Sequence, residues 1–213
     1  GIRDRLRSRG LVDVYKRQGL NVAECKIRMF GSVTAYMTKR FDRQNTIQRI
    51  QQEDFCQGLG LSNKKYQRTE GGPSLKQCFQ FIHNNLANKA KDELHFLKSI
   101  VFNFLIGNSD AHGKNFSYLH TANGYVLSPL YDLVSTQVYP QLAKEMSMSI
   151  GGEYEPDRIT RTNFMVMAKE LGVKSQLIND ILDKLAAEII VQAEKLKDCL
   201  LYTSPSPRDR SLS

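Results

Sequence analysis

The stretch that decides the fold is Phe102-Asn103-Phe104-Leu105-Ile106-Gly107-Asn108-Ser109-Asp110-Ala111-His112-Gly113-Lys114-Asn115-Phe116-Ser117. Apolar residues recur at three- and four-residue spacing from Leu94 to Phe104, which predicts an amphipathic helix over residues 91–105. Gly107 can take the left-handed conformation that ends a helix. Residues 108–115 are too polar for a core, so we expect a buried helix that leads directly into a surface loop.

Three oxygen-bearing side chains in and after this loop have a spacing that suggests chemistry. Asn115 stands five positions after Asp110, and Asp132 stands 22 positions after Asp110. Phosphoryl transfer from a nucleoside triphosphate needs a carboxylate that orients the acceptor hydroxyl, together with hard oxygen ligands for Mg²⁺. The same residues also suit an Asx-rich turn that caps strands, so the spacing alone leaves both interpretations open.

The remaining sequence predicts a mainly helical α+β fold. Four strand-like runs form two expected hairpins, at residues 23–29, 34–41, 116–120 and 125–127. Asn123-Gly124 favours a type I′ turn in the second hairpin. The acidic run Gln52-Glu53-Asp54 is interpreted as a helix N-terminus. Further helical patterns cover residues 75–86, where Ser74 can cap, 163–171 and 176–197.

Composition favours one globular unit of ordinary size. The chain has 213 residues, 41% hydrophobic and 24% charged, with a formal charge of +8. Residues 1–18 carry +4 and residues 199–213 carry +1, so the central part is only weakly basic and nucleic-acid binding is not indicated. The four cysteines are widely separated, which argues against a zinc site or a disulfide framework. No run approaches the roughly 20 apolar residues of a membrane span, so we expect a cytoplasmic protein.

The two ends look foreign to the domain. Residues 13–18 and 199–209 resemble translated sequencing-adapter DNA, so we expect residues 1–18 and 199–213 to be tails that take no part in the fold. Natural disordered tails are the alternative interpretation. In either case we assign no function to these segments.

Six segments form a specific set: residues 102–117, Leu127-Ser128-Pro129-Leu130-Tyr131-Asp132, Arg40-Phe41-Asp42-Arg43, Gln52-Glu53-Asp54-Phe55-Cys56-Gln57, Gly71-Gly72-Pro73-Ser74 and Ser149-Ile150-Gly151-Gly152-Glu153-Tyr154. Together they resemble the HipA family of serine/threonine-protein kinases, the toxins of HipA/HipB-type toxin–antitoxin systems. The resemblance extends over almost all of residues 19–198. It implies a protein-kinase-like C-lobe at residues 44–198, preceded by a remnant β-hairpin of the N-lobe and the hinge at residues 19–43.

The resemblance also implies site residues. Asp110 would be the base that orients the substrate hydroxyl, and Asn115 and Asp132 would be Mg²⁺ ligands. The ATP-binding residues would be Lys39, Arg40 and Phe41 at the adenine, Asp42 at the ribose, His112 and Lys114 at the phosphates, and Asn115, Tyr131 and Asp132. Other interpretations stay open, since His112 also suits a structural role in its loop and Phe41 also suits core packing. The remaining histidines, His83, His95 and His120, are interpreted as structural.

Partners follow from the resemblance as well. The family implies a protein substrate such as glutamyl-tRNA synthetase, and a HipB-like antitoxin that binds operator DNA. The family's ATP-binding lysine and its phosphate-covering loop with an autophosphorylated serine do not occur before Cys25. We therefore expect an N-terminally truncated fragment that is inactive alone. The alternative is a non-catalytic module that keeps the fold for partner or DNA contact.

Overall fold

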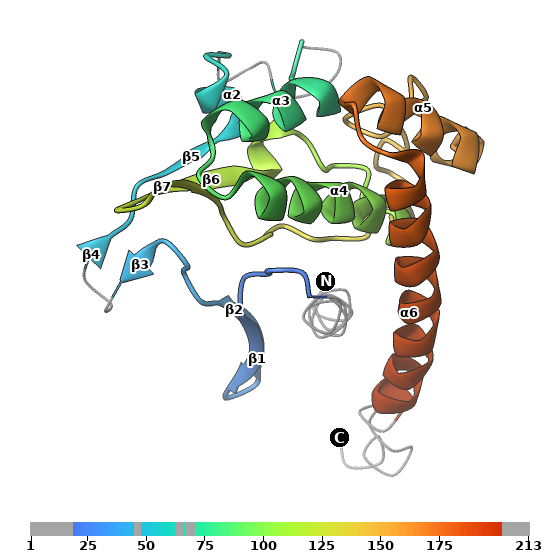
Figure 1. Ribbon diagram of the computed structural model, residues 1–213. Helices are drawn as coiled ribbons and strands as arrows, with labels where there is room; N and C mark the ends of the chain where they lie inside the picture. The colour runs from blue at the N-terminus through green and yellow to red at the C-terminus, as the bar shows by residue number, and fades with distance from the viewer. Residues whose placement is uncertain (1–18, 45–47, 63–65, 67–70, 202–213) are drawn as a thin grey trace.

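The computed structural model describes residues 19–44, 48–62, 66 and 71–201 (Figure 1). The expected tails therefore lie outside the described residues, apart from residues 199–201. The strands are β1 (Cys25–Phe30), β2 (Val33–Thr38), β3 (Arg43–Gln44), β4 (Gln48–Arg49), β5 (Gln52–Asp54), β6 (Ser117–Thr121) and β7 (Gly124–Leu127). The helices are α2 (Phe55–Gly58), α3 (Leu75–Asn85), α4 (Lys89–Leu105), α5 (Arg161–Leu171) and α6 (Ser175–Leu201), with short 3₁₀ turns η2 (Gly113–Asn115), η3 (Thr136–Val138) and η4 (Pro156–Arg158).

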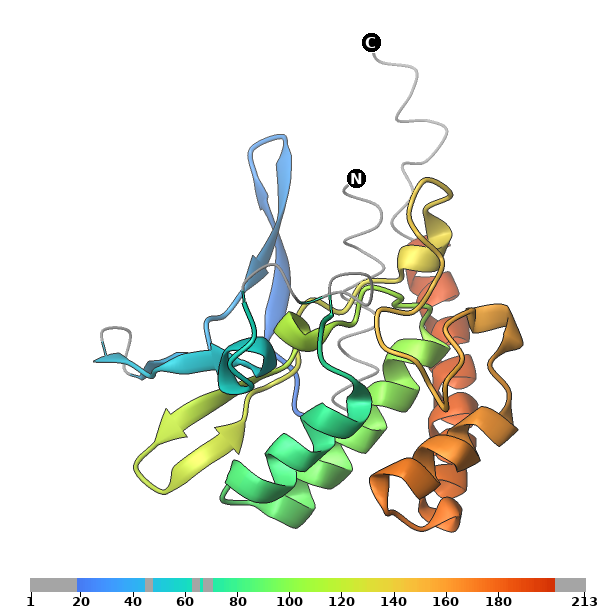
Figure 2. The ribbon, with the colours of Figure 1, turned by 90° about the horizontal axis from the view of Figure 1, so that it is seen from above.

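The first hairpin forms as expected. β1 and β2 pair antiparallel from Cys25↔Thr38 to Phe30↔Val33, and Gly31 takes a positive φ of 59° in the turn. Figure 2 shows this hairpin projecting away from the helices. The chain preceding it is tied to the body, because Val22 forms a parallel bridge with Leu130.

A three-stranded antiparallel sheet, ordered β5-β6-β7, lies beside the helices (Figure 1). The interpretation of residues 52–54 as a helix N-terminus was wrong for Gln52 and Glu53, which pair with Leu119 and Tyr118 of β6. Only Asp54 caps a helix, since its side chain accepts the Gln57 N–H of α2 at 2.8 Å. The partner strand lies more than 60 residues away, so local charge could not reveal the pairing.

The second hairpin also forms, but its turn differs from the expected type. Thr121 pairs with Gly124, so Ala122 and Asn123 make the loop. A type I′ turn needs positive φ at both central residues. Gly124 has a φ of 103°, whereas among the described residues Asp132 is the one non-glycine with positive φ. Asn123-Gly124 therefore marks the hairpin correctly but not the turn type.

Helix α4 is the centre of the helical part. It contacts α3 and α6, while α5 packs on α3 and α6 (Figures 1 and 2). Ser74 caps α3 through the Gln77 N–H at 3.2 Å, as its sequence predicted. Gly172, with a φ of 71°, ends α5, again as predicted.

Helix α6 is longer than its sequence pattern indicated. It begins at Ser175 and continues to Leu201, which includes the first residues of the segment expected to be a tail. No helix in the described part of the chain is both long and apolar enough to cross a membrane.

Candidate active site

The end of α4 fixes where the polar loop begins. The N–H of Gly107 bonds to the carbonyl of Phe104 at 3.0 Å, and the N–H of Asn108 bonds to that of Asn103 at 2.8 Å. These two bonds form a Schellman motif, which requires a left-handed residue at Gly107, and its φ is 68°. The helix therefore ends at this motif, and the backbone of Asn108 lies against that of Asn103.

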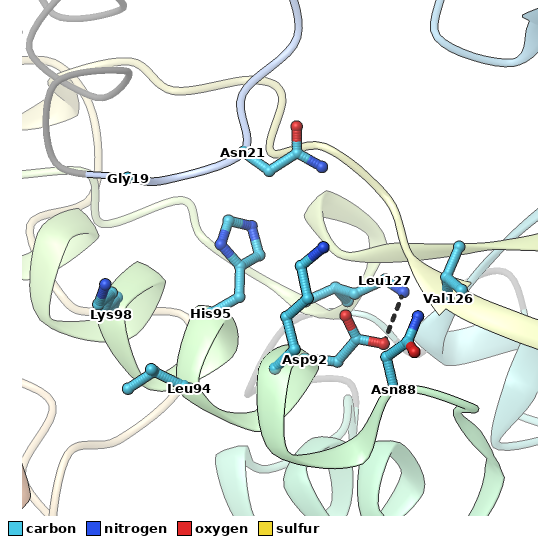
Figure 3. A pocket seen from close by; sticks show the side chains of 10 residues that line it. Gly19, Asn21, Asn88, Asp92, Leu94, His95, Lys98, Val126 and Leu127 are labelled. Carbon is cyan, nitrogen blue, oxygen red and sulfur yellow. Dashed lines mark hydrogen bonds between the residues drawn. The ribbon is translucent and has the colours of Figure 1, made fainter.

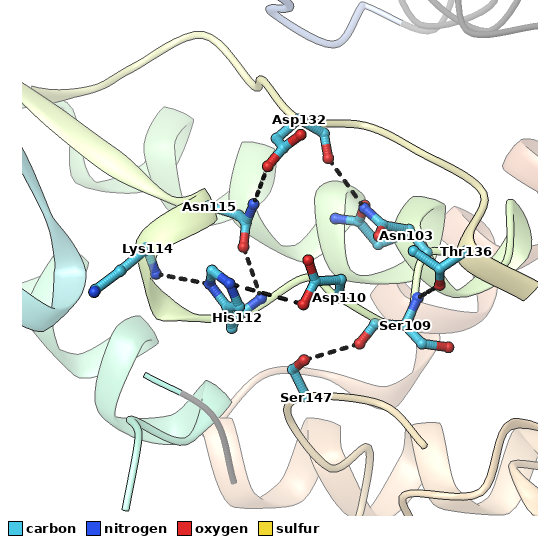
Figure 4. Close-up of polar contacts among 10 residues, drawn as sticks. Asn103, Ser109, Asp110, His112, Lys114, Asn115, Asp132, Thr136 and Ser147 are labelled. Carbon is cyan, nitrogen blue, oxygen red and sulfur yellow. Dashed lines mark hydrogen bonds and ion pairs between the residues drawn. The ribbon is translucent and has the colours of Figure 1, made fainter. Parts of the chain in front are cut away.

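The loop and the segment after β7 bring the three predicted oxygen-bearing residues together. Asn115 donates from Nδ2 to Oδ2 of Asp132 at 2.9 Å. Figure 4 shows Asp110, Asn115 and Asp132 gathered beside Asn103. The Asp110 side chain is 56% exposed, so its carboxylate is open to an incoming group.

The electrostatic surroundings suit Asp110 to accept a proton. Partial burial raises the pKa of Asp110 above its ordinary value, the charge of His112 lowers it, and the negative charge of Asp132 raises it again. The net result is a raised pKa. A carboxylate with a raised pKa is a stronger base than an ordinary aspartate.

His112 and Lys114 organise the loop between these residues. The Nδ1 atom of His112 accepts the Lys114 N–H at 3.3 Å, and Asn115 Oδ1 accepts the His112 N–H at 3.2 Å. Burial lowers the pKa of His112, more than the neighbouring carboxylates raise it. His112 thus caps the η2 turn, as its structural interpretation expected. The Nζ atom of Lys114 lies 4.3 Å from the centre of the Tyr66 ring, a cation–π distance.

Asp132 has an unusual backbone conformation, with a φ of 56°. The left-handed region costs a residue with a Cβ about 1–2 kcal/mol, so surrounding contacts must hold it there. The preceding residue is anchored, because the Tyr131 hydroxyl donates to the Lys114 carbonyl at 2.6 Å and also bonds to Ser117. Burial raises the pKa of Tyr131 to about 12, so it remains a donor at neutral pH.

The expected hinge is connected to this site through Phe41, whose ring stacks on Tyr131 with centroids 5.8 Å apart. Lys39, Arg40 and Phe41 also line an open pocket of about 430 Å³ with residues 20–24. The N–H of Lys39 is engaged, since it bonds to the Glu24 carbonyl at 2.7 Å. Phe41 thus packs against Tyr131, in agreement with its packing interpretation, while its role at the adenine stays a prediction.

Asp42 is held by two arginines and does not face an open cleft. It is 4% exposed, and its carboxylate accepts from Arg40 Nε at 2.7 Å and Arg43 Nη1 at 2.6 Å. The hydrogen bond from Arg40 is the main cause that lowers the pKa of Asp42 to about 2. A ribose could reach this carboxylate only if the arginines moved.

The Asp42 contacts predict a pH-dependent contribution to stability. A carboxylate whose pKa is lower in the folded state stabilises the fold fully above its unfolded pKa, and this stabilisation is lost as the pH falls through the folded value. We expect Asp42→Asn to lower the free energy of unfolding at pH 6, and this difference from the parent to shrink as the pH falls from about 5 towards 2. Urea unfolding of both proteins at pH 6 and pH 3 measures it. An equal difference at both pH values would contradict the ion pairs.

Ser109 is held by a set of hydrogen bonds that the sequence did not predict. The Ser109 N–H bonds to Thr136 Oγ1 at 2.8 Å, and the Ser109 carbonyl accepts from Ser147 Oγ at 2.9 Å (Figure 4). Gln137 Nε2 donates to Ser109 Oγ at 2.6 Å. The residue before Asp110 is thus fixed by a segment that follows Asp132. Single hydroxyl and amide residues in loops give no sequence signal for such contacts.

A separate pocket of about 280 Å³ lies along the N-terminal half of α4 (Figure 3). None of the predicted site residues lines it. Burial lowers the pKa of His95 in its wall to about 4, which agrees with the structural interpretation of this histidine. Asp92 accepts the Leu127 N–H at 3.3 Å and so ties α4 to β7. This pocket is part of the scaffold.

The donor set at Asn115 and Asp132 fits Mg²⁺. Its members offer carboxylate and amide oxygens, the hard ligands that Mg²⁺ prefers. Among the described residues no donor bonds to Oδ1 of Asp132, so this oxygen is available to a metal ion. Asn115 Oδ1 accepts one backbone N–H and keeps a second lone pair.

The sequence profile of the HipA-like C-terminal domain family matches residues 11–193. The match begins inside the segment 1–18 that was expected to be a foreign tail. A curated protein of Sinorhizobium fredii, named "Putative kinase Y4mE", is 39% identical over 164 residues, which cover 75% of this chain and 39% of that protein. The serine/threonine-protein kinase toxin HipA of Shewanella oneidensis is 33% identical over 208 residues, which cover 91% of this chain and 47% of HipA. The chain thus spans less than half the length of either relative.

Solved structures agree with this assignment. The Shewanella oneidensis complex of HipA, HipB and operator DNA matches with a TM-score of 0.81 and 31% identity, over 92% of this chain and 49% of the other. A Helicobacter pylori proinflammatory kinase, CtkA, matches with a TM-score of 0.50 and 12% identity, over 88% and 84% of the two chains, and supports the kinase-like fold alone. The chain has mixed helices and small sheets, as a kinase-like fold of this kind does. It belongs to the HipA-like C-terminal domain family.

Proposed function

We propose that this chain is the catalytic part of an ATP-dependent serine/threonine-protein kinase of the HipA toxin type. The observation that carries the proposal is that Asp110, Asn115 and Asp132 lie together, although they come from two segments joined by a hairpin, and that both carboxylates are exposed. Two of these side chains are hydrogen-bonded to each other at 2.9 Å. A degenerate kinase has no chemical reason to keep all three.

Each residue has a role in this proposal. Asp110 orients the substrate hydroxyl and accepts its proton, and its raised pKa supports that task. Asn115 and Asp132 hold Mg²⁺, which offsets the charge on the triphosphate when bound. Lys114 and His112 face the phosphates, while Lys39, Arg40, Phe41, Asp42 and Tyr131 form the adenosine side. Asp42 takes the ribose after its arginines rearrange.

The partners are proposed from the relatives. The matching HipA structure contains HipB and operator DNA, and this chain would bind a HipB-like antitoxin and, through it, DNA. The substrate is a cytoplasmic protein, of which glutamyl-tRNA synthetase is our candidate. Because the ATP lysine and the phosphate loop are not found before Cys25, we propose that these 213 residues alone have little activity.

Loss of the Asp132 carboxylate tests the proposal. The protein is expressed with the coding sequence upstream of this chain, and phosphate transfer from labelled ATP to protein is measured. We expect Asp132→Ala to lower labelling more than about 100-fold, since even an outer partner of a metal ligand contributes about 10- to 100-fold. Asp180→Asn, at an exposed position of α6, is the control. If Asp132→Ala labels as well as the parent, the kinase proposal fails.

A further inference from the structure

The backbone conformation of Asp132 needs an explanation, since it is the one described non-glycine residue with positive φ. Its carboxylate is held by Asn115, but that bond restrains only the side chain. The backbone carbonyl of Asp132 has a different partner, Asn108, which donates from Nδ2 over a long distance of 3.4 Å. Asn115 thus holds the side chain of Asp132, and Asn108 holds its main chain.

Asn108 is itself held in position by Asn103. Its Nδ2 atom donates a second hydrogen bond to Asn103 Oδ1 at 2.8 Å, so both N–H groups of the amide are used. The backbones of the two residues are also joined, because the Schellman motif at the end of α4 pairs the Asn108 N–H with the Asn103 carbonyl at 2.8 Å. Asn103 and Asn108 are 3% and 2% exposed, so neither can contact a ligand.

We infer that Asn108, oriented by Asn103, is a positioning residue that keeps Asp132 in the left-handed conformation in which its carboxylate points to the metal-binding place beside Asn115. The chain of contacts runs from Asn103 at the end of α4 through the buried amide of Asn108 to the backbone of Asp132. The inference rests on the proposed function for its catalytic consequence. Its conformational part stands on the contacts alone.

Two isosteric substitutions separate positioning from general damage. Asn108→Asp removes the amide donor, and the new carboxylate repels both the Asp132 carbonyl and Asn103 Oδ1. Asn103→Asp buries a similar charge one hydrogen bond away but keeps an oxygen acceptor for Asn108. The Asn103 side chain has no other hydrogen bond among the described residues, which makes it a matched control. Asn108→Ser, which keeps one donor, is the reserve variant if Asn108→Asp does not fold.

The first readout is independent of activity. Backbone NMR of the 213-residue chain reports the conformation of residue 132 through its Cα and Cβ shifts and its HN–Hα coupling. We expect residue 132 to leave the left-handed region in Asn108→Asp or Asn108→Ser and to remain there in Asn103→Asp. An unchanged residue 132 in a folded Asn108 variant overturns the inference, whatever the activity.

The second readout is the Mg²⁺ concentration that gives half-maximal phosphorylation, measured on the protein expressed with its upstream coding sequence. We expect the Asn108 variants to raise it about tenfold, as loss of an outer-shell partner does, with the KM for the protein substrate unchanged. A moved residue 132 with an unaltered Mg²⁺ requirement also overturns the inference. If the parent transfers no phosphate, the proposed function fails and the catalytic role of Asn108 fails with it, while NMR still decides the conformational part.

Discussion

Asp110→Asn is expected to lower the rate of phosphate transfer about 10²- to 10⁴-fold while leaving the KM for ATP close to the parent value. Asparagine has nearly the shape of aspartate but cannot accept the proton of the substrate hydroxyl. The Asp110 side chain is 56% exposed. The described residues give its carboxylate one polar contact, from Oδ1 to Nε2 of His112 at 3.8 Å, so the substitution removes little structural support. The effect should therefore fall on kcat.

The measurement is steady-state phosphorylation by the protein expressed with its upstream coding sequence. Asp157→Asn changes another exposed aspartate, in the η4 turn, and serves as the control. A drop in kcat of less than about tenfold would show that Asp110 is not the base. A large rise in the KM for ATP with kcat unchanged would instead assign Asp110 to nucleotide binding.

The sequence predicted the parts of the fold that depend on local periodicity. The amphipathic spacing in α4, the caps at Ser74 and Gly172 and the break at Gly107 are all local signals, and the structure confirms them. Pairing partners are a different matter. Gln52 and Glu53 lie in β5 because they pair with β6. No property of residues 52–54 indicates a partner strand more than 60 residues away.

The same distinction between local signals and long-range contacts holds for the site. The spacing of Asp110, Asn115 and Asp132 was visible in the sequence, and the structure brings these residues together. The contacts that hold them were not visible, because Ser109, Thr136 and Ser147 are common loop residues. Asn103 gave a signal that could have been used, since a polar residue on the apolar face of a buried helix needs a partner. Asp42 shows the opposite case, in which a predicted ligand residue is engaged by neighbouring arginines.

The second large effect is expected from the core that supports the loop carrying Asp110 and Asn115. Phe55 is fully buried, and its ring centre lies 5.4 Å from that of Phe81, 6.0 Å from that of Phe96 and 6.2 Å from that of Phe116. It thereby joins α2, α3 and α4 to the residue that follows Asn115. Phe55→Ala should lower the free energy of unfolding by about 3–5 kcal/mol, because a buried aromatic side chain is replaced by a cavity.

A loss of this size is a large part of the roughly 5–15 kcal/mol that stabilises an ordinary domain. Urea unfolding followed by circular dichroism measures it, with Phe55→Leu expected to lose less because leucine fills most of the space. Val138→Ala, at a position that is 50% exposed, should change stability by less than about 0.5 kcal/mol. Equal losses for Phe55→Ala and Val138→Ala would mean that the aromatic cluster does not support the fold. Because Phe116 follows Asn115 directly, a folded Phe55→Ala protein should also exchange the amide protons of residues 108–115 faster than the parent.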